Sequence, residues 1–189
     1  MHDLESYIQQ HFGINKESLS TVANLFAKQD LPKGSYFLKE GQTCDKLSFI
    51  KSGYLRIFTN VADKEITQWI AGENYFITEL SSMIFCTPSR WNIQALSDCE
   101  LYTLSRKDYE NLHLIVPEWP VLEKLFISKC FVTLEDRVFT FLSQTAEERY
   151  NHLFAYNPSL FNNIPLQYIA SMLGMTPETL SRIRRKSIS

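Results

Sequence analysis

The segment LQYIASMLGMTPETLSRIRR, residues 166–185, contains two short amphipathic stretches on either side of a glycine. In the first stretch Ile169 and Leu173 are apolar at helical spacing, and in the second Leu180 and Ile183 are. Each stretch therefore predicts a short helix with one buried face.

The residues between these stretches favour a turn followed by a helix start. Gly174 can adopt the positive φ that such a turn needs, and Met175 is an apolar residue suited to fill its inner side. Ala170 is small where the two helices come closest. Thr176 is a suitable N-cap and Pro177 a suitable first residue for the second helix. Together these positions predict a helix-turn-helix, whose second helix can lie in the major groove of DNA.

The exposed side of the predicted second helix carries groups that recognise DNA. Arg182 can donate two hydrogen bonds to a guanine, and Glu178 can accept one from a cytosine amino group or orient the arginine. Basic residues at the end of the helix are suited to phosphate contacts, and they make this end locally basic although the formal net charge is −2. The predicted DNA-binding residues are Glu178, Thr179, Ser181, Arg182, Arg185 and Lys186.

The first part of the chain has a different pattern. Residues 1–28 have apolar positions at helical spacing, which predicts N-terminal helices. Short alternating runs broken by glycine-containing turns follow, and they predict an antiparallel β-roll. The predicted strands are 35–39, 46–50, 54–59, 65–71, 91–97 and 100–104.

Residues 118–145 predict one long helix with two apolar stripes. One stripe has heptad spacing and is expected to pack on a twin helix in a homodimer, while the other packs on its own β unit. The alternative is a helix buried entirely within one monomer. The predicted dimerisation residues are Ile127, Phe131, Leu134, Val138 and Phe141. The second stripe consists of Leu122, Leu125, Phe126, Val132, Phe139 and Leu142.

The remaining composition excludes several classes of function. The four cysteines and four histidines are scattered without metal-ligand spacing, so no metal site is expected. No catalytic motif is present, and the chain is not expected to be an enzyme. Because no apolar run is long enough to span a bilayer, we expect a cytoplasmic protein without a membrane partner.

The order of these parts resembles the Crp/Fnr family, the cyclic-AMP receptor and fumarate–nitrate regulators, over essentially the whole chain. In the β part the resemblance rests on PKG at 32–34, LKEG at 38–41, FIKSGYLR at 49–56 and GE at 72–73. The run IASMLGMTPETLSR at 169–182 is similar to the DNA-binding signature of the family, most of all to its Bacteroidetes-type versions.

The resemblance implies an α+β fold with a cyclic-nucleotide-binding-like jelly roll, a dimerisation helix and a helix-turn-helix. The expected domains are an effector-type domain at 1–117, a linker helix at 118–145 and a DNA-binding domain at 146–189. It implies a homodimer on double-stranded promoter DNA, with RNA polymerase as a further candidate partner. The alternative is a ligand-sensing module whose helical tail docks a protein.

Two departures from the family pattern bear on these expectations. Glu79 matches the ribose-binding glutamate, but Ser89 stands where the phosphate-binding arginine is expected and Arg90 comes one position late. A one-residue slip along a strand turns a side chain to the other face, although a loop adjustment between 85 and 90 could restore Arg90. We therefore expect a degenerate site, with a small-molecule effector other than cyclic AMP or with none. The family also usually continues into a β-hairpin wing, and no wing is evident before Ser189.

Overall fold

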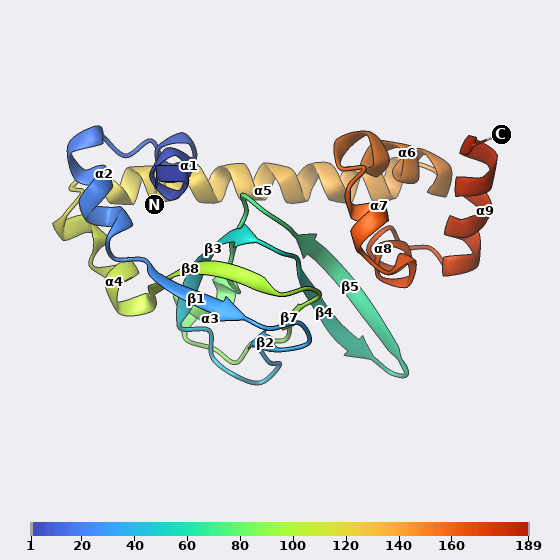
Figure 1. Cartoon of the computed structure of the whole chain (residues 1–189), viewed down its shortest axis with the longest axis horizontal. Helices are drawn as coiled ribbons and strands as arrows, with labels where there is room; N and C mark the ends of the chain where they lie inside the picture. Colours follow the sequence, from blue (N-terminus) through green and yellow to red (C-terminus); the bar gives the residue numbers. More distant parts are fainter. Residues whose placement is uncertain (1, 189) are drawn as a thin grey trace.

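The computed structural model describes residues 2–188, and side chains within 4–186. A long helix, α5 (Trp119–Ser143), spans the molecule, and a β-roll lies against its middle (Figure 1). The N-terminal helices gather at one end of α5, and a group of short helices lies at the other end (Figure 1). Within the described residues no helix is both long and apolar enough to cross a membrane.

The N-terminal segment forms two helices, α1 (His2–Phe12) and α2 (Lys16–Ala23). Gly13, with a φ of +72°, separates them, and the Asn15 side chain caps α2 by accepting from the backbone N–H of Ser18. The predicted helical region extended to residue 28, which is wrong at its end. Residues from Ala27 onward instead pair antiparallel with a later strand, because the apolar side chain of Leu31 is buried in the roll.

Within the part of the chain that the structure describes, eight short strands form two four-stranded antiparallel sheets, with the orders β1-β8-β3-β6 and β2-β7-β4-β5. This arrangement confirms the α+β class and the antiparallel roll. The six predicted strands correspond to β2, β3, β4, β5, β7 and β8, whereas β1 and β6 were not predicted. The strands are β1 (Ala27–Leu31), β2 (Tyr36–Leu38), β3 (Lys46–Ser52), β4 (Leu55–Val61), β5 (Lys64–Ala71), β6 (Phe76–Ile77), β7 (Asn92–Ala95) and β8 (Cys99–Ser105).

The main core lies between the two sheets and extends under α1, α2 and the first half of α5. Phe12 of α1 contacts Phe76 and Phe126, with ring centroids 5.1 and 4.5 Å away, so three distant segments share one aromatic cluster. Three short helices complete this half of the chain. They are α3 (Leu80–Phe85), α4 (Arg106–Glu110) and the 3₁₀ helix η1 (Leu112–Leu114).

Helix α5 buries only one side within the chain. Leu122 and Phe126 pack on the main core, as the second stripe predicted. The rest of that stripe does not, so the prediction is wrong for Leu125, Val132, Phe139 and Leu142, which are exposed. At 3.6 residues per turn, Leu125, Val132 and Phe139 lie about 100° around the helix from Leu122 and Phe126, so they face away from the main core.

The C-terminal helices form a second core, to which Ile70 of β5 also belongs. A capping box fixes the start of the first of them, because Thr145 and Glu148 exchange side-chain and backbone hydrogen bonds. Trp69 of β5 packs against both this core and the main core, so it joins the two. The helices are α6 (Ala146–Tyr156), α7 (Leu160–Asn163), α8 (Leu166–Met172) and α9 (Pro177–Ile188).

Helix α8 is docked directly on β5 of the roll. The hydroxyl of Ser171 accepts from the backbone N–H of Thr67 at 2.9 Å and donates to the carbonyl of Glu65 at 3.2 Å. β5 is an edge strand of its sheet, so its outer backbone groups lack a neighbouring strand. Ser171 of α8 forms hydrogen bonds with two of these groups, which would otherwise bind water.

A buried arginine lies at the same contact. Arg56 of β4 is 1% exposed, and its guanidinium donates to Thr67 at 2.9 Å and to the Glu65 carboxylate at 2.6 Å. The rings of Phe58 and Tyr168 lie 4.3 and 3.9 Å from its Cζ. Because Tyr168 belongs to α8, the arginine is enclosed only when the helical part and the roll are together.

The turn glycine offers a test of the packing between α5 and α8. Gly174 has a φ of +64°, and a Cβ there would lie 2.7 Å from a ring carbon of Phe141. We expect Gly174→Ala to lower the free energy of unfolding by about 2–3 kcal/mol in urea titrations, from backbone strain plus displacement of the ring. Gly41→Ala is the matched control: its φ is +83° with nothing within 4 Å, so about 1 kcal/mol is expected. Equal losses would contradict a tight contact with Phe141.

The docking contact offers a second test. Arg56→Ala removes the hydrogen bonds and leaves a gap between Phe58 and Tyr168, so we expect a loss of about 2–3 kcal/mol in unfolding free energy. Arg56→Met retains the packing and removes the buried charge, and the loss should be about 1 kcal/mol or less. The exposed Arg90→Ala serves as control, with a change below about 0.5 kcal/mol. If Arg56→Ala behaves like the control, the buried guanidinium does not support the docking.

Candidate nucleic-acid interface and effector site

The predicted turn between the two C-terminal helices is present with the expected local chemistry. The N–H of Met175 donates to the carbonyl of Ala170 at 3.0 Å, which closes the turn after α8. The hydroxyl of Thr176 accepts from the N–H of Thr179 at 3.2 Å, so Thr176 caps α9. Leu180 and Ile183 are buried in the C-terminal core, which fixes the face that α9 turns inward.

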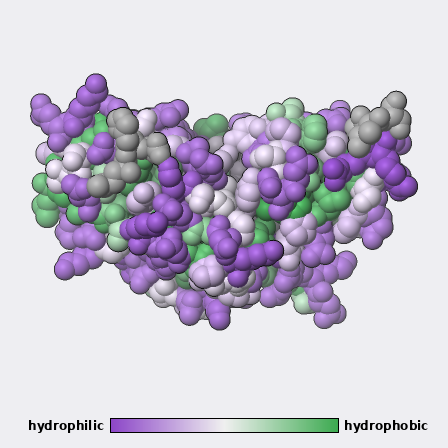
Figure 2. All heavy atoms as spheres, in the orientation of Figure 1, coloured by the Kyte–Doolittle hydropathy of each residue, from purple (hydrophilic) through white to green (hydrophobic). Residues whose placement is uncertain are grey.

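The opposite face of α9 carries the residues predicted to contact DNA. Glu178, Arg182, Arg185 and Lys186 are exposed, and the two hydroxyl residues between them, Thr179 and Ser181, are partly exposed. The structure therefore brings all six onto the outer side of one helix. Figure 2 shows hydrophilic residues at this end of the molecule, beside a hydrophobic patch over the helical group.

Two side chains of α9 have local partners. Hydrogen bonds from its own backbone N–H and from the Thr176 hydroxyl hold the pKa of Glu178 below its usual value. Glu178 is thus a carboxylate at neutral pH at the N-terminal end of the helix. Arg184 differs from its neighbours, since its guanidinium lies over the ring of Phe161 at 5.9 Å and packs within the helical group.

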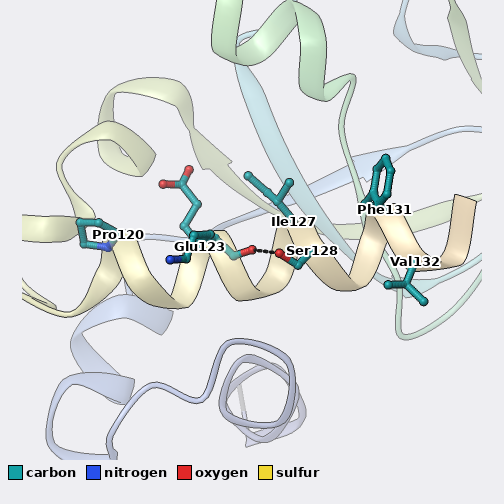
Figure 3. A pocket seen from close by; sticks show the side chains of 7 residues that line it. Pro120, Glu123, Ile127, Ser128, Phe131 and Val132 are labelled. Atoms are coloured by element: carbon teal, nitrogen blue, oxygen red, sulfur yellow. Dashed lines mark hydrogen bonds between the residues drawn. The ribbon is translucent and has the colours of Figure 1, made fainter. Parts of the chain in front are cut away.

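Along α5, most of the predicted dimerisation residues face solvent. Phe131, Leu134 and Val138 are 62, 51 and 58% exposed. A shallow groove of about 510 Å³ runs along this part of the helix, and Ile127 and Phe131 point to the same side of it while Val132 points to another (Figure 3). Phe141 is less exposed, because its ring lies against Gly174 within the chain.

The three predicted effector residues each have contacts within the chain, and their side chains do not converge on a common phosphate position. The Glu79 carboxylate caps α3 by accepting from the N–H of Ser82 at 2.6 Å. Ser89 is buried, and its hydroxyl accepts from the N–H of Trp91 at 3.0 Å. Arg90 is exposed and lies over the ring of Trp91, 5.0 Å from its centroid. Within the described residues, no hydrogen bond or ion pair joins Glu79 to Arg90.

Sequence reasoning missed three arginines that the structure places at the junction between roll and helices. These are Arg56 on β4, Arg137 on α5 and Arg149 on α6. No signal in the sequence singled out Arg137, since α5 contains five other charged residues. Among the described residues, no group of three or more His, Cys, Asp or Glu side chains could hold a metal ion.

A known domain family matches the part of the chain that forms the roll. Residues 28–114 match the family described as cyclic nucleotide-binding domain. No curated protein matches the sequence.

Solved structures resemble this chain over most of its length or over a smaller part of it. FixK2 from Bradyrhizobium japonicum has a TM-score of 0.72 at 16% identity, over 85% of this chain and 83% of that chain. Catabolite activator protein from Thermus thermophilus has a TM-score of 0.58 at 21% identity, over 92% and 84%. The regulatory domain of Toxoplasma gondii PKA with cAMP has a TM-score of 0.56 at 21% identity, over 65% and 46%.

The two kinds of neighbour differ in how much of them the chain spans. It covers less than half of the Toxoplasma protein and 40% of a cAMP-bound PfPKA-R chain, but most of the length of the two bacterial proteins. At identities of 16–21% these likenesses show the fold alone. All of these matches are regulatory proteins or domains rather than enzymes. Residues 28–114 thus match a cyclic nucleotide-binding domain, and the chain shares its fold with these solved structures.

Proposed function

We propose that this chain is a sequence-specific DNA-binding transcription regulator of the Crp/Fnr type, in its Bacteroidetes-type form. The observation that carries the proposal is the exposed, basic face of α9, at the end of a well-capped helix whose apolar face is buried against α8. A helix with this division between its faces can enter the major groove while its partner helix holds it in place.

The six residues on that face have different roles in the proposal. Arg182 reads a guanine, and the carboxylate of Glu178 accepts from a cytosine amino group or orients the arginine. Thr179 and Ser181 contact a phosphate or a thymine methyl. Arg185 and Lys186 bind phosphates, which adds affinity and salt dependence but little sequence preference.

The proposed regulator is a homodimer joined through α5. Residues 127–142 expose an apolar surface that no part of the described chain covers, and continuous apolar surface of this kind usually marks an interface. Twin helices in contact along Ile127, Phe131, Leu134 and Val138 would bury it, with Phe141 at the end of the contact. Two copies of α9 would then face half-sites about one turn of DNA apart.

The chain would divide its work among three domains. Residues 1–117 are the effector-type domain, 118–145 the linker and dimerisation helix, and 146–189 the DNA-binding domain. A ligand regulates such a dimer only if its affinity differs between two placements of the DNA-binding domains. We place the proposed dimer in the cytoplasm, where RNA polymerase at the same promoter is a further candidate partner.

Cyclic AMP is not the proposed effector. Binding its phosphate in the roll would require Arg90 to leave Trp91 and turn inward, or Ser89 to serve without a positive charge. An anion buried without a charged partner is strongly disfavoured. Glu79, Ser89 and Arg90 therefore mark the effector segment of a degenerate site that takes another small molecule or none.

Substitutions on α9 test DNA binding. Arg182→Ala should weaken binding to a selected operator about 10–100-fold in gel-shift titrations and relax the preference at one base pair, because it removes a base contact. Lys186→Gln should weaken all sequences similarly and reduce the slope of log affinity against log salt by about 1. Lys33→Gln, on an exposed turn of the roll, is the control and should leave both quantities unchanged.

Unchanged affinity after Arg182→Ala would exclude the base contact. Salt-insensitive or undetectable DNA binding by the unaltered chain would instead favour the alternative, a sensing module whose helical tail docks a protein. The PKA regulatory structures, which cover 60–65% of this chain, support that alternative as the second candidate.

The dimer is tested by placing charges on the exposed face of α5. Phe131→Glu combined with Val138→Glu puts like charges opposite each other in the proposed seam, so sedimentation velocity should show a monomer. Lys129→Glu lies on the same helix outside the seam and should leave the dimer intact. A dimer that survives the double substitution would show that α5 is not the interface.

A further inference from the structure

A cavity of about 430 Å³ lies where the roll, α5 and the C-terminal helices meet. Its walls include Trp69 of β5, Arg137 and Phe141 of α5, Arg149 and His152 of α6, and Leu173 after α8. The volume is in the range of sites for small organic ligands, and the mixture of aromatic walls with a few charged groups is typical of them. Neither the roll residues predicted for the effector nor the face of α9 contributes to it.

The polar groups of this cavity are mainly cationic. Arg137 is half-buried and donates one hydrogen bond, from Nη2 to the carbonyl of Met172 at 2.9 Å. Arg149 donates from Nε to the carbonyl of Leu173 at 2.9 Å and from Nη1 to that of Gln144 at 2.8 Å. A guanidinium has five N–H donors, so both arginines keep donors without a partner in the described chain.

The charged residues that line the cavity carry more positive than negative charge. Asp136 is the one carboxylate among the described lining residues, and it forms no ion pair with either arginine. Burial lowers the pKa of Arg137, which means that the charged form is poorly solvated where it lies. An anion beside it would supply the missing compensation.

Aromatic rings surround these cations. The guanidinium of Arg137 lies 5.1 Å from the Trp69 ring centroid and 5.4 Å from that of Phe141, and that of Arg149 lies 5.0 Å from the Phe141 ring. The rings hold the two side chains in fixed orientations and offer flat apolar surface beside the free donors. A ligand with a charged end and a flat apolar body would use both features.

We propose that this cavity binds a small organic anion, with a flat aromatic or heterocyclic body and one carboxylate or phosphate group. Arg137 and Arg149 bind the anionic group, and Trp69 and Phe141 contact the body. Of the lining residues of α5, Thr133 and Thr140 lie roughly 120–140° around the helix from the centre of the proposed dimer seam, and Arg137 lies roughly 80° from it. Phe141 ends that seam, so the partner helix would meet the cavity only at this residue.

A ligand in this cavity would also regulate the protein, and this part of the inference rests on the proposed function. Because the walls come from the roll, the long helix and the DNA-binding part, a bound ligand would favour the docked placement of α8 over any other. The binding itself requires no DNA, so it can be tested apart from DNA recognition.

Calorimetric titration of the full chain with three probes tests the site. The probes are 2-naphthyl phosphate, 2-naphthoate and the neutral 2-naphthalenemethanol. At least one anionic probe should bind with a dissociation constant below 1 mM, at least tenfold tighter than the neutral probe, and the stronger anion identifies the preferred charged group. Arg137→Gln and Arg149→Gln should each weaken that binding at least tenfold, whereas the control Lys33→Gln, which removes a positive charge from an exposed turn of the roll, should leave it unchanged.

Since Arg137 also supports the end of α8, its substitution could disturb the fold. Thr140→Leu avoids this, because it adds bulk to the cavity and retains both arginines, and it should weaken the anionic probe at least tenfold with an unaltered circular dichroism spectrum. The proposal is overturned if no anionic probe binds, if the neutral probe binds as tightly, or if Arg149→Gln and Thr140→Leu bind like the unaltered chain. Loss of DNA binding alone leaves it intact.

Discussion

The enclosed guanidinium of Arg56 is the constraint on which the joining of the two halves depends. Moving an ion from water into a protein interior carries a penalty of several kcal/mol, so each of its contacts must be in place. The β4–β5 hairpin supplies Glu65 and Thr67, and α8 supplies the ring of Tyr168. The hairpin alone cannot enclose the charge. The position of α8 on β5, and with it the position of α9, follows from this arrangement.

Trp69 and the arginine-lined cavity belong to the same junction. Trp69 packs on both cores, while Arg137 reaches from α5 to the last carbonyls of α8, which are unpaired at a helix end. The junction thus combines aromatic rings and guanidinium groups with aliphatic contacts, among them Ile70 of β5 in the C-terminal core. The guanidinium groups would regain water if the two halves separated, which offsets part of the energy of their contacts.

The sequence predicted those elements that are determined by residues close together in the chain. Gly174, Thr176 and Pro177 define the turn and the start of α9 within four residues, and alternation within β3, β4 and β5 marks the strands. The two-residue strand β6 is too short for any pattern, and it exists only through its pairing with β3. The burial of Arg56 depends on Tyr168, more than a hundred residues away, and no window of sequence contains both.

The charged character of the junction bears on whether the protein can switch. An apolar contact of the same area would hold the docked arrangement more strongly, because it would carry no desolvation penalty. If α8 separated from β5, Arg56 would lose the Tyr168 ring but regain water, and Glu65, half-exposed already, would remain its partner. The water that Arg56 regains would therefore lower the free energy of separating α8 from β5. Ligands that act between sites typically contribute a coupling of about 1–3 kcal/mol. In the proposed regulator α9 must take two positions, and the buried arginine would supply a joint that allows both.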